Sequence, residues 1–191
     1  RENGGQYSHG AVWAVIAQAE LGNAELAWEY FRMLSPAHRA SDAPQRTRYG
    51  LEPYVMAGDV CSAPPYAGRG GWSWYTGSSA WMYRAAVEYL VGLRVEAGRF
   101  CLHPCLPSAW TELRLHFKLR GKNVQVLMHR RPQVAGVDHG SATDEIPTLQ
   151  VAAKQWIAFD ELPTESRLTL DLSSELAQPV NPLDPANGPP G

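Results

Sequence analysis

The sequence predicts a mainly α fold followed by β structure, because the hydrophobic pattern changes twice along the chain. Apolar residues recur at helical spacing in the first half, and after Gly98 they alternate with polar residues instead. A proline-rich stretch without periodicity closes the chain. We therefore expect helices in residues 1–98, a small antiparallel β layer in residues 99–172 and a disordered tail in residues 173–191.

The composition is that of a folded domain without the charge of a nucleic-acid binder. Of the 191 residues, 45% are hydrophobic and 19% are charged, which is enough for a packed core. The net charge is −2 and there is no basic run, so we expect no nucleic-acid partner. Three cysteines fit a reducing compartment better than a disulfide framework, and we expect a cytoplasmic location.

Two helices are expected near the start of the chain. Apolar faces of helical period cover about residues 8–21 and about residues 24–34, with Gly22 and Asn23 between them. Helices joined by so short a turn pack antiparallel, as a helical hairpin. Residues 37–67 lack periodicity and contain several prolines, so we expect a long irregular loop, a kind of segment that usually carries function.

The third helix begins inside a stretch rich in glycine and aromatic residues. Residues 68–75 hold a glycine-rich turn and several aromatics, and after Thr76 and Gly77 a helix with a broad apolar stripe runs to near Gly98. Thr76 or Ser78 can cap its first turn with a hydroxyl group. A helix start with free amide groups, a hydroxyl group and a glycine suits a bound anion, although a capped core helix is the commoner structure.

His9 stands at the start of the first helix, as Thr76 stands at the start of the third. A neutral imidazole can donate a hydrogen bond to a bound oxyanion. If the two helix starts converge, His9, Thr76 and the amide group of Gly77 would form a pocket for phosphate or sulfate. The alternative is a histidine in a polar loop.

The β region begins where the apolar period changes to two. Residues 113–119 and 124–128 alternate and are joined by a turn at residues 121–123, so they predict a β-hairpin. Residues 100–103 also alternate. Weaker strand candidates are residues 148–153, 155–159 and 167–172.

Cys101, His103 and Cys105 would share one face of an alternating strand, as metal ligands can. Pro104 interrupts that strand, and no second ligand pair stands at zinc spacing. We therefore expect no metal site and no cofactor.

Aromatic and acidic residues in the loops are the candidates for sugar binding. Trp72 and Trp74 can stack on sugar rings or pack in the core. Glu2, Glu52 and Asp59 could bind sugar hydroxyl groups, but nothing marks the pair of carboxylates that a glycosidase needs. The residues alone predict a helical domain that binds a carbohydrate or an anion.

Two long motifs resemble signatures of glycoside hydrolase family 94, the inverting carbohydrate phosphorylases. They are Arg-Glu-Asn-Gly-Gly-Gln-Tyr-Ser-His-Gly-Ala-Val-Trp at residues 1–13 and Trp-Ser-Trp-Tyr-Thr-Gly-Ser-Ser-Ala-Trp-Met-Tyr at residues 72–83. The resemblance extends to about Arg130 and is closer to the phosphorylase-like C-terminal region of the cyclic β-1,2-glucan synthases. It implies that the chain holds the last helices of an (α/α)6 barrel, followed by a small β layer.

The resemblance also implies a reaction. In the family, inorganic phosphate is a co-substrate that attacks the anomeric carbon, while an aspartic acid protonates the glycosidic oxygen. His9, Thr76 and Gly77 match the family's phosphate ligands. The family's catalytic aspartate lies upstream of the two motifs, so no catalytic residue is assigned in this chain.

The same resemblance assigns the sugar-binding residues. Arg1 stands where relatives have a basic residue that helps to bind the acceptor sugar, and Trp72 and Trp74 are the candidates for stacking on sugar rings. The implied partners are a β-linked glucan or disaccharide, inorganic phosphate and the remainder of a parent polypeptide. That parent could be anchored in the inner membrane.

The chain begins at Arg1 rather than methionine, and we expect a C-terminal fragment of the phosphorylase-like domain of a cyclic β-1,2-glucan synthase. A partial barrel exposes apolar helix faces, so the isolated chain should be inactive and poorly soluble. Two alternatives stay open. One is a cellobiose-type or other β-disaccharide phosphorylase, and the other is a non-catalytic carbohydrate-binding module.

Overall fold

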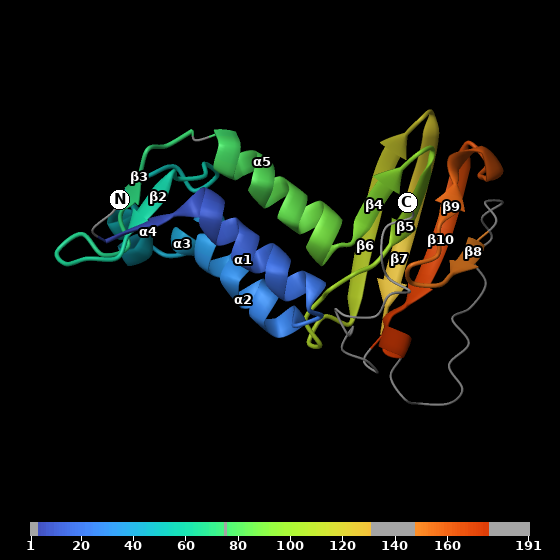
Figure 1. Ribbon diagram of the computed structural model, residues 1–191, viewed down its shortest axis with the longest axis horizontal. Helices are drawn as coiled ribbons and strands as arrows, with labels where there is room; N and C mark the ends of the chain where they lie inside the picture. The colour runs from blue at the N-terminus through green and yellow to red at the C-terminus, as the bar shows by residue number, and fades with distance from the viewer. Residues whose placement is uncertain (1–3, 75, 131–147, 176–191) are drawn as a thin grey trace, which may run out of the picture. The chain divides into compact units, whose positions relative to one another are not determined.

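The computed structural model describes residues 4–74, 76–130 and 148–175, which Figure 1 traces as ribbons. These residues form two compact units. The first contains residues 4–74, 76–91 and 105–107, and the second contains the rest of the described residues.

The first unit is built on a hairpin of two helices, as the sequence predicts. Helix α1 (Ser8–Glu20) and helix α2 (Ala24–Leu34) lie side by side in Figure 1. Between them Gly22 takes a left-handed conformation with φ of +75°, which glycine adopts without strain. Helix α5 (Thr76–Arg84) continues into a π-helical turn (Ala85–Leu90) and packs against α1.

The three helices share one apolar core. Its buried members include Val12 and Val15 of α1, Ala27 and Leu34 of α2, and Met82 of α5. Burial of apolar surface, worth about 25 cal/mol per Å², is the force that holds the starts of these helices in fixed positions. None of the described helices is both long enough and apolar enough to cross a membrane.

The third helix ends at Leu90, whereas the sequence predicted an end near Gly98. Leu93 falls on the apolar stripe of the helix, so the pattern alone extends the helix too far. Gly92 ends it instead, because its φ of +79° is left-handed and a Cβ atom there would collide with a backbone oxygen. The chain turns at this glycine into strand β4 (Leu93–Glu96).

The segment predicted to be an irregular loop contains two short helices. Helix α3 (Pro36–Arg39) and helix α4 (Ala43–Tyr49) each have a proline in the first turn, where the missing amide hydrogen is not needed. Asp42 caps α4, because its Oδ1 accepts a hydrogen bond from the backbone nitrogen of Gln45 at 2.8 Å. The buried Tyr49 donates its hydroxyl hydrogen to a backbone oxygen at 3.3 Å. These interactions order much of the segment.

A three-stranded antiparallel sheet, which the sequence did not predict, joins the start of the chain to the glycine-rich stretch. Strand β2 (Asp59–Cys61) lies between β1 (Gly5–Tyr7) and β3 (Gly70–Gly71). Strands of two or three residues show no readable alternation, which is why the hydrophobic pattern missed them. This sheet holds the start of α1 beside the loop that precedes α5.

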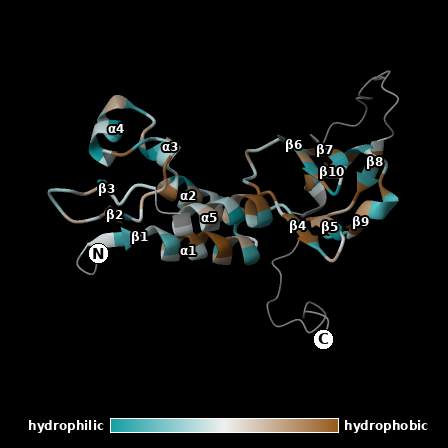
Figure 2. Ribbon diagram, turned by 90° about the horizontal axis from the view of Figure 1, so that it is seen from above, coloured by the Kyte–Doolittle hydropathy of each residue, from teal (hydrophilic) through white to brown (hydrophobic). Residues whose placement is uncertain are grey.

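The second unit contains two facing sheets, seen from above in Figure 2. The four-stranded sheet has the order β6 (Glu112–Leu119), β7 (Lys122–His129), β10 (Glu165–Asp171) and β8 (Thr148–Val151). The three-stranded sheet has the order β4, β5 (Arg99–Leu102) and β9 (Ile157–Ala158). Phe100 of β5 meets Phe117 of β6 at a ring-centroid distance of 5.6 Å, which ties the two sheets together.

The predicted hairpin is confirmed, but the predicted antiparallel layer is wrong in part. Strands β6 and β7 pair antiparallel, whereas β10 runs parallel to both of its neighbours, β7 and β8. Parallel neighbours need a long connection, and a long stretch of chain separates β7 from β10. Alternation reveals the faces of a strand but not its direction.

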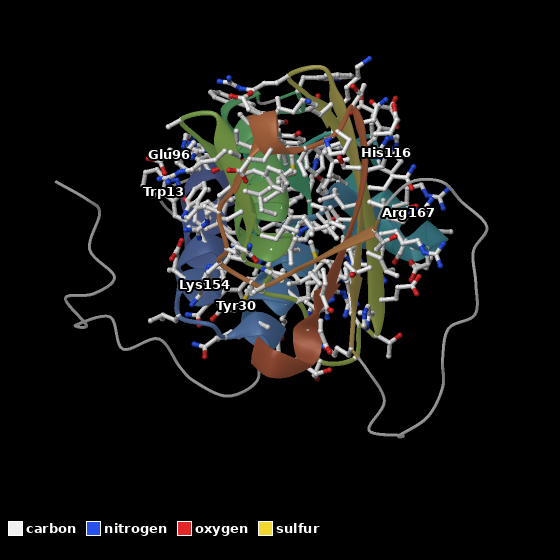
Figure 3. All side chains as sticks on the ribbon, turned by 90° about the vertical axis from the view of Figure 1, so that its right-hand side faces the viewer. Trp13, Tyr30, Glu96, His116, Lys154 and Arg167 are labelled. Atoms are coloured by element: carbon white, nitrogen blue, oxygen red, sulfur yellow. The ribbon has the colours of Figure 1, made fainter. Side chains whose placement is uncertain are left out.

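His116 and Arg167 point away from the outer face of this sheet in Figure 3.

The predicted disordered tail falls mostly outside the described residues. A short 3-10 helix, Leu172–Glu175, ends the described part, so only the first three residues of the predicted tail are described. Residues 176–191 lie outside it, and the predicted domain boundary at residue 98 stays a prediction.

Candidate functional site

The starts of two helices are tied to one short segment, Ala57–Gly58. The Oγ of Ser78, in the first turn of α5, donates a hydrogen bond to the backbone oxygen of Ala57 at 3.2 Å. The backbone nitrogen of Ser8, the first residue of α1, donates to the backbone oxygen of Gly58 at 3.0 Å. Both serines are buried. The starts of α1 and α5 therefore lie close together, as the anion-pocket hypothesis requires.

His9 is the second residue of α1, and three aromatic rings contact its half-buried imidazole. The imidazole stacks on Tyr7 at a centroid distance of 5.8 Å and meets the edge of Trp13 at 5.4 Å. The third ring belongs to Trp81 of α5, at 5.9 Å. Rings packed on several sides restrict the rotation of the imidazole. An imidazole N–H group held in this way can donate a hydrogen bond to an anion.

Thr76 is the first residue of α5 and Gly77 is the second. The first amide groups of an α-helix have no acceptor within the helix, and they form the positive end of its dipole. Gly77 brings no side chain that would keep a ligand away from this end. The structure thus places His9 at one helix start and Thr76 and Gly77 at the other, and phosphate binding itself stays a prediction.

Trp81 and its neighbours link the two helices, and sequence reasoning missed this role. The rings of Trp81 and Trp13 meet at 5.7 Å, nearly perpendicular to each other. The guanidinium carbon of Arg84 lies 4.7 Å from the ring centroid of Trp81. Glu88 holds Arg84 through an ion pair at 2.8 Å, and this hydrogen-bonded pair raises the pKa of Arg84. The helical spacing of Trp81 indicated only that it lies on an apolar stripe in the core. The spacing of four residues between His9 and Trp13, which brings their side chains together on one face of α1, was the one sequence feature that pointed to an aromatic contact with His9.

Trp72 and Trp74 are exposed rings on an unusual stretch of backbone. They are 63% and 66% exposed, so neither packs in the core of the described residues. Their φ angles of +56° and +60° lie in the left-handed region, which bulky residues rarely adopt. The ring of Trp74 stands 6.4 Å from the ring of Tyr54, in the loop after α4. Sequence reasoning did not single out Tyr54.

The remaining sugar-site candidates are placed only in part. Arg1 and Glu2 lie outside the described residues. Asp59 lies on strand β2 rather than in a loop, and its Oδ1 fills the space that a side chain at Gly71 would need. Glu52 is half-buried.

In the part of the chain that the structure describes, no three His, Cys, Asp or Glu side chains gather as metal ligands. Cys101 is buried in β5, and this burial raises the pKa of its thiol.

Comparison with known families divides the chain in two. Residues 1–92 match the sequence model of the glycosyl hydrolase 94 superfamily, catalytic domain. Residues 93–136 match that of the glycosyl hydrolase family 65, C-terminal domain, which the sequence analysis did not expect. The two matches meet beside Gly92, where the second structural unit begins.

Similar characterised proteins act on carbohydrates according to their names. The cyclic β-(1,2)-glucan synthase NdvB of Rhizobium meliloti is 43% identical over 68% of this chain. The N,N'-diacetylchitobiose phosphorylase of Vibrio furnissii and the solabiose phosphorylase of Paenibacillus borealis are each 29% identical, over 76% and 63% of this chain. The chain spans 5%, 19% and 15% of the lengths of these three relatives. Through residues 1–92, the chain belongs to the glycosyl hydrolase 94 superfamily.

Proposed function

We propose that this chain carries the phosphate-binding part of an enzyme that cleaves or forms β-glucosidic bonds with inversion and with inorganic phosphate as co-substrate. The observation that carries the proposal is that α1 and α5 both begin at the Ala57–Gly58 segment, within the residues that match the family 94 catalytic domain. The names of two similar proteins, both phosphorylases, support the use of phosphate. The identity of 43% to a cyclic β-(1,2)-glucan synthase supports a parent protein of that kind.

The phosphate would bind between the two helix starts. Helix α1 has 13 residues and α5 has 9, so each presents the positive end of a helix dipole to the same region. Neither helix has an acidic residue in its first turn. An acidic side chain there would compete with a bound anion for the amide groups. His9, Thr76 and the amide group of Gly77 would then donate hydrogen bonds to the phosphate oxygens.

In the proposed reaction, a phosphate oxygen bonds to the anomeric carbon while the bond from that carbon to the glycosidic oxygen breaks. A carboxylic acid gives its proton to the glycosidic oxygen, and the products are a sugar 1-phosphate of inverted configuration and a shortened sugar. Phosphate takes the place of the water and the general base of an inverting glycosidase, so one carboxylic acid is sufficient. We place this acid upstream of the two motifs, which would leave the isolated chain inactive.

The helices of the first unit would form the end of an (α/α)6 barrel, with Arg1, Trp72 and Trp74 on the side of the sugar. Apolar side chains exposed on α1 and α2 support burial against further helices, since Trp13 and Met33 are 54% and 48% exposed. Trp13 is labelled at the surface of α1 in Figure 3. A cytoplasmic location belongs to the same proposal and rests on the three free cysteines.

The test uses the product of the complete open reading frame and measures the sugar 1-phosphate released in the presence of phosphate. We expect release from linear β-1,2-glucan, and we expect His9→Ala to reduce it at least about a hundredfold, because a lost oxyanion donor has an effect of that size. His116→Ala is the matched control, since His116 is an exposed histidine on β6. Cleavage that needs no phosphate, or that survives His9→Ala, would refute the proposal.

A disaccharide phosphorylase is the second candidate, because two of the similar proteins are named for disaccharides. Faster release from cellobiose or chitobiose than from β-1,2-glucan would favour it. A non-catalytic carbohydrate-binding module would instead bind sugar with an affinity that neither phosphate nor His9→Ala changes.

A further inference from the structure

Two exposed aromatic rings stand next to the start of α5 and take no part in the proposed phosphate pocket. Tyr54 is 74% exposed and Trp74 is 66% exposed. Their ring centroids are 6.4 Å apart and their planes are inclined by 71°. Trp74 precedes Thr76 by two residues. The two rings therefore form an aromatic corner, Tyr54–Trp74, beside the helix start at which phosphate would bind.

The backbone of the loop presents Trp74 to the outside. Trp72 and Trp74 both have left-handed φ angles, which residues of this size rarely adopt. The backbone nitrogen of Gly58 donates hydrogen bonds to the backbone oxygens of Gly71 and Trp72, both at 2.9 Å. The carboxylate of Asp59 fills the space above Gly71. A loop that keeps large rings exposed in an unfavourable backbone conformation indicates a binding surface.

We propose that the Tyr54–Trp74 corner binds the glucan chain next to the reacting bond and selects β-1,2-linked over β-1,4-linked chains. The apolar faces of pyranose rings stack on aromatic rings. A β-1,4-linked glucan is a straight, flat ribbon that fits coplanar rings, whereas β-1,2 linkages bend the chain so that successive sugars face different directions. Rings inclined by 71° fit two sugars of a bent chain but not two sugars of a flat ribbon.

The corner is built from two uncharged side chains, which suits a neutral sugar. Tyr66, another exposed ring, differs, because the guanidinium group of Arg69 lies over it at 5.7 Å from the ring centroid. A nucleic acid would need cations for its phosphate groups as well as rings for its bases. The glucan follows from the proposed function, on which this inference rests, and from the relative that is 43% identical and named for β-(1,2)-glucan.

The test uses the product of the complete open reading frame and compares its binding of linear β-1,2-gluco-oligosaccharides and of cello-oligosaccharides of equal length by calorimetry. We expect Tyr54→Ala and Trp74→Ala each to weaken the binding of a long β-1,2-linked chain about five- to tenfold, because each removes one stacking ring. Binding of the β-1,2-linked disaccharide should not change. Tyr83→Ala is the matched control, since Tyr83 is 69% exposed but lies on the body of α5.

The two variants are expected to fold, because both side chains project into solvent, and a thermal unfolding curve checks this. An equal loss of affinity for cello-oligosaccharides would overturn the inference, and so would unchanged affinity for the β-1,2-linked chain in both variants. Oligosaccharide binding through the corner, without any release of sugar 1-phosphate by the product of the complete open reading frame, would support this inference while refuting the proposed function.

Discussion

Replacement of Trp81 by leucine tests whether the aromatic rings hold the imidazole of His9 in place for phosphate. Trp81 is half-buried, and its ring contacts His9 at 5.9 Å and Trp13 at 5.7 Å. Immobilising one flexible side chain on binding opposes association by about 0.5–1.5 kcal/mol. If Trp81→Leu frees the imidazole, phosphate binding should weaken by about 1 kcal/mol, or about fivefold in the dissociation constant.

The same substitution should also lower the free energy of unfolding. It removes two aromatic contacts, worth about 0.5–1.5 kcal/mol each, and the contact between the ring and the guanidinium group of Arg84. We expect a total loss of about 2 kcal/mol in chemical denaturation. The stability change and the affinity change are measured separately, so one cannot be mistaken for the other.

The assay is a phosphate titration followed by phosphorus NMR, with the wild-type chain, Trp81→Leu, His9→Ala and the double variant. If Trp81 acts by positioning His9, then Trp81→Leu should have no further effect on phosphate affinity in the His9→Ala background. Trp156→Leu is the matched control, because the guanidinium group of Arg99 lies over that ring at 4.8 Å in the second unit. Additive losses, or an unchanged affinity in Trp81→Leu, would refute the reasoning.

Three further predictions concern stability. Gly92→Ala should lower the free energy of unfolding by at least about 2 kcal/mol more than Gly121→Ala, because the new Cβ collides with the backbone of His103 while Gly121 faces open space with a similar φ. Equal losses in urea denaturation would contradict this. Phe100→Ala should lower the stability of the second unit by about 3–5 kcal/mol, since the ring is fully buried between the two sheets, and a loss below about 1 kcal/mol would contradict that packing. Burial raises the pKa of the Tyr49 hydroxyl group above the value of about 10 that it has in the unfolded chain. The buried neutral hydroxyl group therefore contributes its full stabilisation below pH about 10, and this stabilisation is lost as the pH rises through the pKa of the folded state. Tyr49→Phe should therefore flatten the alkaline limb of a plot of stability against pH, and an unchanged limb would show that another group causes it.

The long periodic elements could be predicted from the sequence. Apolar residues that recur every 3.6 residues predicted α1 and α2, and the alternation of apolar and polar residues on either side of residues 121–123 predicted the β6–β7 hairpin. The end of the third helix could not be predicted in this way, because Leu93 continues the apolar stripe past Gly92. The parallel direction of β10 could not be predicted from the sequence either, since pairing between distant strands depends on tertiary contacts.

The two helix starts of the candidate site could be recognised from the sequence, and phosphate binding there stays a prediction. His9 and Thr76 stand at helix starts that the sequence makes recognisable, and the hypothesis that these starts converge agrees with their common attachment to Ala57–Gly58. Trp81 was missed because an aromatic residue on an apolar stripe has the same spacing whether it packs in a core or against a binding residue. Tyr54 was missed because only the fold brings its loop to Trp74.

The most direct test of the central claim is a phosphate titration followed by nitrogen–proton NMR of the labelled chain. We predict that the largest shifts occur at the amide group of Gly77 and the imidazole of His9, and that His9→Ala weakens binding while His116→Ala does not. Shifts confined to other residues, or phosphate affinity that His9→Ala leaves unchanged, would contradict a phosphate site at the paired starts of α1 and α5.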